Sequence, residues 1–370
     1  MGKLNICVYA ICKNESKFVD AWMDSMIEAD QVIVTDTGSD DDTVEKLQKR
    51  GAVVYLEEIK PWRFDVARNI SLGHVPEDVD ICVCTDLDER FEAGWRNALE
   101  EAWLNHRPKH SGGISKTGRY LYNWSLKPDG SPDIQFYYFK VHERHGFRWN
   151  CPVHEYVQYT GTVPLETVYI DGMVLNHYPD TAKSRGTYLP LLELAVQEAP
   201  EDNRMRYYLG REYMYREKWQ ESVTMLISYL AMPGSQWNEE RCAAMRWIAK
   251  SCRMMGRIEE AFSWYFKAIA EAPHMREPYV EFSKMCYELH NWPMTYYLAC
   301  EALKILEKSK TFVNMGYSWD YTLDDLCAIA AYQMEMKEQS LKHAEQALAY
   351  DPSDQRLQNN LRIIQLSLKV

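Results

Sequence analysis

Residues 80–91 read DICVCTDLDERF, and this stretch decides the fold of the first half of the chain. Ile81 to Cys84 are apolar on both faces, which is typical of a strand in a parallel sheet that is covered by helices on both sides. Asp86 and Asp88 follow at once. Because one residue separates them, their side chains would point the same way on an extended chain. They would lie at the carboxyl edge of the sheet, where open α/β folds bind ligands.

The residues upstream alternate short apolar runs with helical segments. This alternation predicts a mostly parallel, Rossmann-like sheet with helices on both faces. The predicted strands are residues 4–10, 31–36, 52–56 and 80–85, and the predicted helices are 17–29, 43–50 and 67–73.

The pattern changes downstream, from Gly118 to Asn176, where aromatic, polar and turn residues alternate as in RYLYNW and FYYFKV. It favours shorter antiparallel strands or loops that complete a mixed sheet. Residues 127–133, KPDGSPD, are rich in turn formers, and we interpret them as a lid or an acceptor loop.

The second half is helical and repetitive. Four degenerate copies of a two-helix repeat begin near Leu209-Gly210, Ile248-Ala249, Phe282 and Cys327-Ala328, and they resemble the tetratricopeptide pattern of about 34 residues. Small residues at such positions allow paired helices to approach closely. We therefore expect an α/β domain over residues 1–187 and an all-α, tetratricopeptide-like repeat domain over residues 188–370.

Bulk properties exclude several classes of function. The net charge of −12 and the pI near 5.4 argue against binding to nucleic acid or to an anionic membrane. No run approaches the roughly 20 apolar residues of a membrane span, and the N-terminal apolar run is too short for a signal peptide. The ten cysteines show no pair at zinc-finger spacing, which favours buried thiols in a reducing compartment. We expect a cytoplasmic protein.

Two further motifs indicate a function for the paired aspartates. Hard carboxylates at a sheet edge suit Mg²⁺ or Mn²⁺ carrying a diphosphate, although acidic residues after a strand are often only solvated turn residues. Residues 10–15, AICKNE, leave the first strand, and residues 35–43, TDTGSDDDT, leave the second. In this order the three motifs resemble glycosyltransferase family 2, and the resemblance spans roughly residues 4 to 95. It implies a GT-A fold.

The resemblance also implies roles for individual residues. Asp36 would accept a hydrogen bond from the nucleobase, with Asn14 and Glu15 lining the nucleotide pocket. Asp86 would contact ribose or the metal ion, and Asp88 would ligate the metal. The structural alternative for residues 36–43 is a loop capped by Asp41 or Asp42 that leads into a helix.

Residues 61–69, PWRFDVARN, resemble a segment that precedes the fourth strand in a bacterial subgroup of this family. The resemblance implies that Arg68 faces the nucleotide sugar, and its forked donors match the oxygens of a diphosphate. The structural alternative is an arginine at the start of a helix that pairs with Asp65.

Two later segments resemble the same subgroup: WNCPVHE at residues 149–155 and NHY at 176–178. Glu155 is our candidate for the base that takes the acceptor's proton, with Asp133 in reserve. His177 and His154 are candidate metal ligands. Cys151-Pro152 replace the glycine that the subgroup places before V-H-E.

The resemblance implies an inverting, hexosyltransferase-type glycosyltransferase that uses a nucleotide sugar, with UDP as the default nucleotide. The acceptor would be a peptide, a protein or a cell-surface glycan, as for bacterial enzymes with this arrangement. The alternatives are an inactive scaffold and a sugar nucleotidyltransferase; the latter normally has a glycine-rich loop, which residues 12–16, CKNES, lack. The repeats would bind partners or form a homo-oligomer through Trp237, Trp292 and Trp319, unless these pack within the array.

Overall fold

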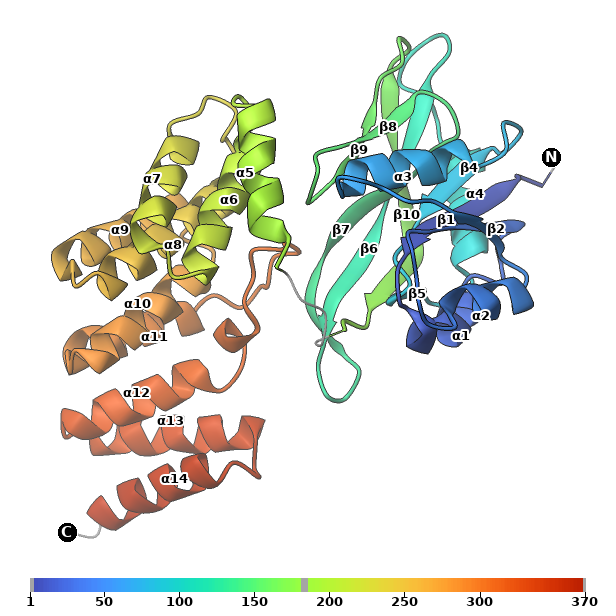
Figure 1. Ribbon diagram of the computed structural model, residues 1–370. Helices are drawn as coiled ribbons and strands as arrows, with labels where there is room; N and C mark the ends of the chain where they lie inside the picture. The colour runs from blue at the N-terminus through green and yellow to red at the C-terminus, as the bar shows by residue number, and fades with distance from the viewer. Residues whose placement is uncertain (1–2, 181–185, 369–370) are drawn as a thin grey trace. The chain divides into compact units, whose positions relative to one another are not determined.

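The computed structural model describes residues 3–180 and 186–368 (Figure 1). The chain divides into two compact units, Met1–Glu198 and Ala199–Val370. Helix α5 (Tyr188–Glu198) therefore groups with the first unit, one helix later than the expected division at residues 187 and 188. Tyr188 packs edge-on against Phe64, and Glu198 accepts a hydrogen bond from Arg63, which explains this grouping.

The first unit is built on an eight-stranded mixed sheet with the strand order β3-β2-β1-β4-β7-β6-β10-β5. Its first half is parallel, as predicted, because β1 pairs with both β2 and β4, and β2 pairs with β3. The strands are β1 (Ile6–Cys12), β2 (Gln31–Asp36), β3 (Val53–Leu56) and β4 (Ile81–Cys84), and the helices between them are α1 (Ser16–Ser25), α2 (Thr43–Lys49) and α3 (Phe64–Gly73).

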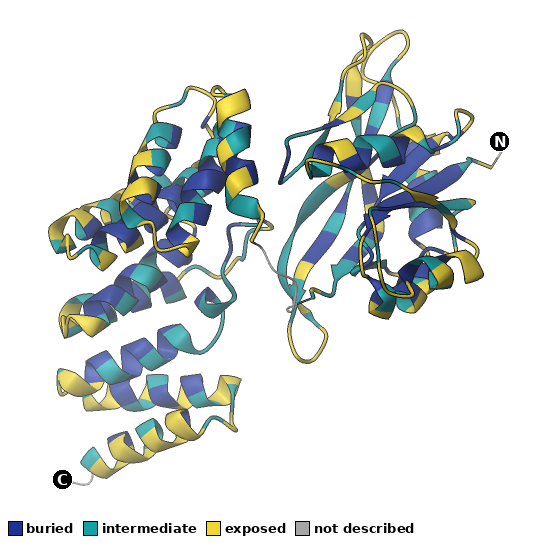
Figure 2. Cartoon of the chain, in the orientation of Figure 1, coloured by how far each residue is buried: buried dark blue, intermediate teal, exposed yellow. Residues whose placement is uncertain are grey.

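Strand β1 is buried on both faces, and Figure 2 shows the centre of the sheet dark blue. Ile6, Val8 and Ala10 contribute to one apolar core, which includes Trp22 of α1 and Trp95. The alternate residues Cys7 and Tyr9 contribute to a second core on the other face, with Leu72 of α3 and Trp149. The sheet is therefore the middle layer of a sandwich, as the all-apolar strands predicted.

The second half of the sheet differs from expectation in length and direction. Three of its strands are long, with 12, 12 and 13 residues, rather than short. Most neighbours are antiparallel, but β6 and β10 pair in parallel, because the chain leaves the sheet to form a small ribbon before it returns. The elements are β5 (Glu89–Phe91), α4 (Trp95–Asn105), β6 (Ser115–Leu126), β7 (Pro132–Glu143), β10 (Leu165–His177) and the ribbon strands β8 (Phe147–Asn150) and β9 (Tyr156–Tyr159).

The segment KPDGSPD forms the tight end of the β6–β7 hairpin. Lys127 N donates to Ser131 O at 2.8 Å, and Gly130 N donates to Lys127 O at 2.9 Å. Strand β7 already begins at Pro132. The turn residues therefore have a local structural role, and a role as a lid or acceptor loop stays a proposal.

The second unit is an array of antiparallel helix pairs, as expected for tetratricopeptide-like repeats, and it is visible as the yellow-to-red half of Figure 1. The pairs are α6–α7, α8–α9, α10–α11 and α12–α13, followed by a final helix α14. The helices are α6 (Asn203–Tyr215), α7 (Trp219–Leu230), α8 (Asn238–Met254), α9 (Ile258–Glu271), α10 (Glu277–Glu288), α11 (Trp292–Leu303), α12 (Thr322–Gln333), α13 (Lys337–Tyr350) and α14 (Gln355–Ser367).

One feature recurs inside these helix pairs. Two small residues 12 positions apart meet where the helices cross, and in three pairs a side chain of one donates to a carbonyl of the other. Ser222 Oγ donates to Gly210 O, Ser283 Oγ to Thr295 O, and Ser340 Oγ to Ala328 O, each at 2.9 Å. Ala249 and Ala261, both fully buried, have the same spacing in the remaining pair. This close approach supports the tetratricopeptide assignment.

Residues 304–321 interrupt the array between α11 and α12, and the chain there folds back onto earlier helices. Phe312 packs against Tyr207, Tyr208 and Trp237 with ring centroids 6.4, 6.4 and 5.3 Å away. Arg246 Nη1 donates to Val313 O at 3.4 Å. The expected exposed tryptophans thus have partners within the array: Trp237 packs on Phe312, Trp292 on His290 and Trp319 on Arg276.

The described part of the chain contains no helix that is both long and apolar enough to cross a bilayer. All ten cysteines are free thiols; Cys151 and Cys300 are half-buried, and the others are buried.

Candidate active site

The first unit brings together three candidate site residues that come from three different sequence motifs. Arg68 lies on α3, Asp86 follows β4, and Glu155 precedes β9. The Arg68 side chain is buried, and it donates from Nε to Glu155 Oε1 at 3.0 Å and from Nη2 to Asp86 Oδ1 at 2.5 Å. The candidate base and a candidate nucleotide-binding carboxylate therefore share one guanidinium group.

Local packing explains why Arg68 points to this position. Asp65 is bound by Arg63, with N–O distances of 3.0 and 2.9 Å, so it is not the partner of Arg68. The Arg68 guanidinium instead lies 5.3 Å from the centre of the Trp149 ring. Asn69 fixes Trp149 in turn, because its amide donates to Trp149 O and accepts from Trp149 N, both at 2.9 Å.

A second cation, Lys140 of β7, reaches the same carboxylate from the opposite side. Its Nζ lies 3.1 Å from Asp86 Oδ2 and 3.7 Å from Glu89 Oε1. Glu89 is fixed by two donors, the hydroxyl of Tyr122 at 2.7 Å and the backbone N–H of Asp86 at 2.9 Å. Sequence reasoning missed Lys140, Glu89 and Tyr122. The available signal was a single lysine within the aromatic strand FYYFKV.

These contacts set the charge states of the acidic residues. Burial tends to raise the pKa of Asp86, but Arg68 and then Lys140 outweigh it and hold that pKa well below its usual range. Burial raises the pKa of Glu89, which Lys140 only partly opposes. Asp86 is thus firmly anionic, and because its side chain is 35% exposed, a ligand can still reach it.

Asp88 has a different partner, His177 at the end of β10. The distance from His177 Nε2 to Asp88 Oδ2 is 3.6 Å, and Tyr178 N donates to Asp88 O at 2.7 Å. His177 Nδ1 lies 3.0 Å from Trp124 O. Because a carbonyl only accepts, Nδ1 carries the hydrogen and Nε2 faces the carboxylate. Burial lowers the pKa of His177, but Asp88 raises it by more, to above its ordinary value.

This arrangement suits a divalent cation at Asp88 and His177. A carboxylate oxygen and an imidazole nitrogen at this separation can ligate one ion. Asp86 is less able to bind the metal ion, because both of its oxygens already contact the cations Arg68 and Lys140. Among the described residues around the ends of β4 and β5, Arg68 and Lys140 contact Asp86, Glu89 and Glu155, and His177 faces Asp88.

Asn14, Glu15 and Asp36 lie at the neighbouring strand ends, because Cys12 of β1 pairs with Asp36 of β2. Asp36 accepts from the backbone N–H groups of Gly38 and Ser39 at 3.0 and 2.9 Å. Asn14 Oδ1 accepts from Asp40 N at 2.9 Å, and Glu15 N donates to Thr43 Oγ1 at 2.8 Å. The N-E segment and the loop after β2 are therefore one hydrogen-bonded unit.

Asp41, not Asp42, provides the side-chain hydrogen bond at the start of α2. Its Oδ1 accepts from Thr43 N at 3.0 Å, whereas Asp42 makes no such capping bond.

The contacts described for His154 and Asp133 are with residues other than those of the Arg68 cluster. The His154 ring packs edge-on against Tyr188, with centroids 5.8 Å apart. Asp133 Oδ2 accepts from Ser125 Oγ at 3.1 Å within the β6–β7 hairpin. Cys151 has a φ of 75°, in the left-handed region that favours glycine. Cys151 therefore adopts a backbone conformation that glycine adopts more readily.

The first unit has a mixed sheet whose fourth strand is followed by Asp-x-Asp, with Asp86 of this motif beside the buried Arg68. Residues 7–156 match the model of the family described as "Glycosyl transferase family 2". This segment of the first unit is thus similar to glycosyltransferase family 2 domains.

Other comparisons cover parts of the chain. The valine–tRNA ligase of Haloarcula marismortui is 29% identical over 173 residues, which make up 45% of this chain and 16% of the ligase. A thermophilic TPR protein of Thermus thermophilus has 17% identity and a TM-score of 0.33, over 48% of this chain and 89% of that chain. The APC/C hetero-tetramer Cut9-Hcn1 has 9% identity and a TM-score of 0.38, over 49% and 33%. At TM-scores below 0.5, the assignment of the repeats depends on their own geometry.

Proposed function

We propose that this protein is an inverting glycosyltransferase that moves a sugar from a nucleotide-sugar donor, with UDP as the default nucleotide, to a nucleophile on a peptide, protein or cell-surface glycan. The junction of Arg68 with Asp86 and Glu155 is the observation that carries the proposal. It places a candidate base and a candidate donor-binding carboxylate around one buried cation, within a family 2 domain.

In this proposal the nucleotide lies along the ends of β1, β2 and β4. The loop formed by Asn14, Glu15 and Asp36 faces the nucleobase, and Asp86 faces the ribose. When a donor binds, Arg68 can release part of its contact with Asp86 and donate to the diphosphate, since its five N–H groups match phosphate oxygens. A divalent ion held by Asp88 and His177, Mn²⁺ or Mg²⁺, would supply positive charge to the diphosphate.

Glu155 is the proposed base. The acceptor's oxygen or sulfur forms a bond to the anomeric carbon while the bond from that carbon to the diphosphate oxygen breaks, and the diphosphate takes the electron pair. The acceptor's proton goes to Glu155. The hydrogen bond from Arg68 Nε to Glu155 Oε1 holds this carboxylate in place and leaves its other oxygen for the proton. The helical repeats are proposed to present the acceptor, in line with the usual role of such arrays.

The first test is thermal unfolding of the full chain with nucleoside diphosphates and nucleotide sugars, each with and without Mn²⁺. A ligand at 100 times its Kd stabilises the folded state by about 2.7 kcal/mol. We expect one nucleotide to raise the midpoint only when metal is present. Asp88→Asn should remove the metal-dependent part, whereas Asp171→Asn, an exposed aspartate of β10, should not.

Measurement of donor turnover in two variants then distinguishes between the two candidate bases, Glu155 and Asp133. Glu155→Gln should reduce kcat by about 10²–10⁴-fold, which is typical for loss of a general base, with nucleotide binding retained. Asp133→Asn, the matched variant, should leave kcat within a few-fold of the starting protein. If the two results were reversed, the base would be Asp133. If no nucleotide stabilised the chain, the inactive-scaffold alternative would replace the proposal.

A further inference from the structure

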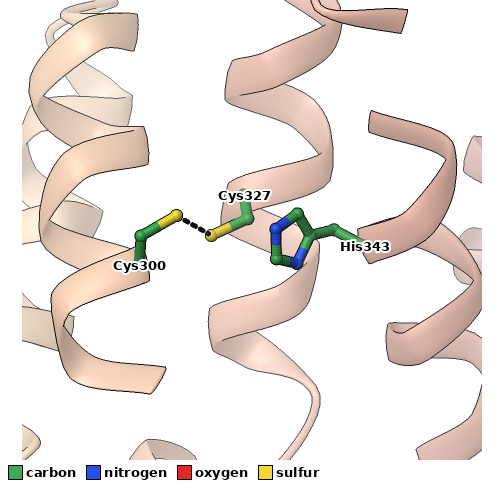
Figure 3. Close-up of side chains that lie close together, drawn as sticks. All are labelled: Cys300, Cys327 and His343. Atoms are coloured by element: carbon green, nitrogen blue, oxygen red, sulfur yellow. Dashed lines mark hydrogen bonds between the residues drawn. The ribbon is translucent and has the colours of Figure 1, made fainter. Parts of the chain in front are cut away.

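Outside the candidate active site, three side chains with metal-binding atoms converge within the helical array. Cys300 lies on α11, Cys327 on α12 and His343 on α13, and their ligand atoms all lie within 4.8 Å of one another. In Figure 3 the two sulfur atoms face each other, and one ring nitrogen of His343 points toward them while the other points away. The three helices belong to two successive repeats.

We propose that Cys300, Cys327 and His343 form a site for a zinc-type divalent metal ion. Two thiolates and one imidazole are the donor set that zinc prefers. The distance between the two sulfur atoms is 3.6 Å. A zinc tetrahedron with bonds of about 2.3 Å has an S–S edge of about 3.8 Å, so both sulfurs can bind one ion with almost no movement. A disulfide would require closure to about 2.05 Å.

Asp324 supplies a second, independent feature of a metal site. Its Oδ1 lies 2.8 Å from Nδ1 of His343, and both side chains are largely buried. An anionic carboxylate can only accept, so Nδ1 carries the hydrogen. Nε2 is therefore the nitrogen that would bind the ion. A carboxylate on the second ring nitrogen is the usual outer partner of a metal-binding histidine, because it fixes both the tautomer and the ring orientation.

Burial differs among the ligands in a way that permits metal entry. Cys327 is buried, whereas Cys300 and His343 are half-buried. With three protein ligands, a tetrahedral ion keeps a fourth position that can hold a water molecule.

The place of the cluster in the array gives the ion a structural purpose. Helices α11 and α12 are connected by residues 304–321, the long interruption of the repeat, whereas α10–α11 and α12–α13 are connected by residues 289–291 and 334–336. An ion bound by α11, α12 and α13 would join the two repeats at the interface where the connecting segment is longest. This inference is independent of the proposed transferase activity.

The test uses the full chain, reduced and freed of metal with a chelator. Zinc binding is measured by competition with a chromophoric chelator, and Co²⁺ is added separately as a spectroscopic probe. We expect one tight zinc per chain, a rise of the unfolding midpoint by roughly 5–10 °C at 100 times the Kd, and a cobalt spectrum with thiolate charge-transfer and tetrahedral bands.

Variants locate the ion. Cys300→Ser and His343→Gln change half-buried residues and should each weaken zinc binding at least 100-fold, and Asp324→Asn should weaken it by about 10–100-fold. Cys151→Ser, another half-buried cysteine but in the first unit, should bind zinc as the starting protein does. Circular dichroism of each metal-free variant confirms that it is folded.

Two outcomes would overturn the proposal. One is unchanged zinc binding in both Cys300→Ser and His343→Gln, which would place the ion elsewhere. The other is a metal-free protein that forms a Cys300–Cys327 disulfide in air and shows no zinc affinity when reduced, which would make the pair a redox site.

Discussion

His142 lies at the end of a chain of hydrogen bonds that fixes its protonation state. Trp149 Nε1 donates to the Tyr9 hydroxyl at 2.9 Å, that hydroxyl lies 2.9 Å from His142 Nε2, and His142 Nδ1 lies 2.7 Å from Glu143 O. The carbonyl can only accept, so Nδ1 carries the hydrogen and Nε2 accepts from Tyr9. The imidazole is therefore neutral. Burial lowers the pKa of His142 to about 4.

This histidine should make the first unit sensitive to acid. Its folded-state pKa lies below its ordinary value of 6.5, so the unfolded chain takes up a proton first as the pH falls. The free energy of unfolding should drop by about 2 kcal/mol between pH 7 and pH 5 through this group alone. His142→Gln keeps an acceptor for Tyr9 but does not titrate, so its loss over this window should be smaller by that amount. Urea unfolding at the two pH values measures both, and equal losses would contradict the assignment.

At the residue scale, motifs indicated candidate site residues that lie in short stretches of sequence. Asp86, Asp88 and Arg68 follow from short patterns, and the structure places Arg68 beside Asp86 and Glu155. Lys140 could not be predicted, because its approach to Asp86 depends on the antiparallel pairing of β4 with β7, far apart in the chain. The Cys300–Cys327 pair was missed for the same reason, since 27 residues separate them and no finger-type spacing is present.

At the scale of elements, the helix pairs depend on small residues at their crossing points. A Cβ atom added at Gly210 would lie 2.6 Å from both Cγ and Cδ2 of Leu226 and 3.3 Å from its backbone nitrogen. The side chain of Leu226 is fully buried, so it has little room to move away. The glycine is therefore required by the contact between α6 and α7.

Gly210→Ala should destabilise the helical unit by about 1–3 kcal/mol, the usual cost of overpacking a core. Gly73→Ala is the matched change at the end of α3, where an added Cβ meets nothing within 4 Å. It should be neutral or slightly stabilising, because alanine favours a helix over glycine. Chemical denaturation followed by circular dichroism compares them, and an unaffected Gly210→Ala would show that α7 can shift away.

Elements with strong periodicity were predicted well. Strand β2 has the predicted bounds, Gln31–Asp36, because its apolar core runs up to the point where the loop begins. The region after residue 118 was predicted less well, with long strands in place of short ones. Its strands β6 and β10 pair with each other although β7, β8 and β9 lie between them in the chain. Pairing between such distant segments leaves no local signal in the sequence.

At the scale of the whole molecule, residues 304–321 close part of the helical unit on itself. Besides Phe312, Met315 N donates to Glu277 Oε1 at 3.1 Å, and Arg276 Nε donates to Ile305 O at 2.8 Å. Repeat arrays usually have contacts only between neighbouring repeats, and their stability is then nearly a sum of local terms. The return to α6 adds a distant contact, so the first three helix pairs should unfold together.

Phe312→Ala should weaken this coupling. It removes the ring that packs against Tyr207, Tyr208 and Trp237, and because Phe312 is half-buried, the cost should lie below the roughly 3–5 kcal/mol of a fully buried phenylalanine. We expect faster amide hydrogen exchange in α6 and α8 than in the starting protein. Tyr297→Ala, which truncates an exposed ring of α11, is the control and should leave these rates unchanged. Equal protection of α6 in both variants would show that the returning segment is dispensable.

The overall plan, an α/β domain followed by helical repeats, was predictable because the two halves differ in hydrophobic period. The division between them was placed one helix early, since α5 has the helical pattern of the second half but packs with Phe64 of the first. The return of residues 304–321 to α6 was not predictable, because a single phenylalanine in an irregular stretch does not specify its distant partners.

The same return has a consequence during protein synthesis. Phe312 follows Tyr207 by roughly a hundred residues, and ribosomes add about 5–20 residues per second. For roughly 5 to 20 seconds, the nascent chain would therefore lack the part of the cover over Tyr207 and Tyr208 that Phe312 provides. A chaperone that recognises exposed aromatic side chains would have that interval in which to bind, and emergence of the segment around Phe312 would end it.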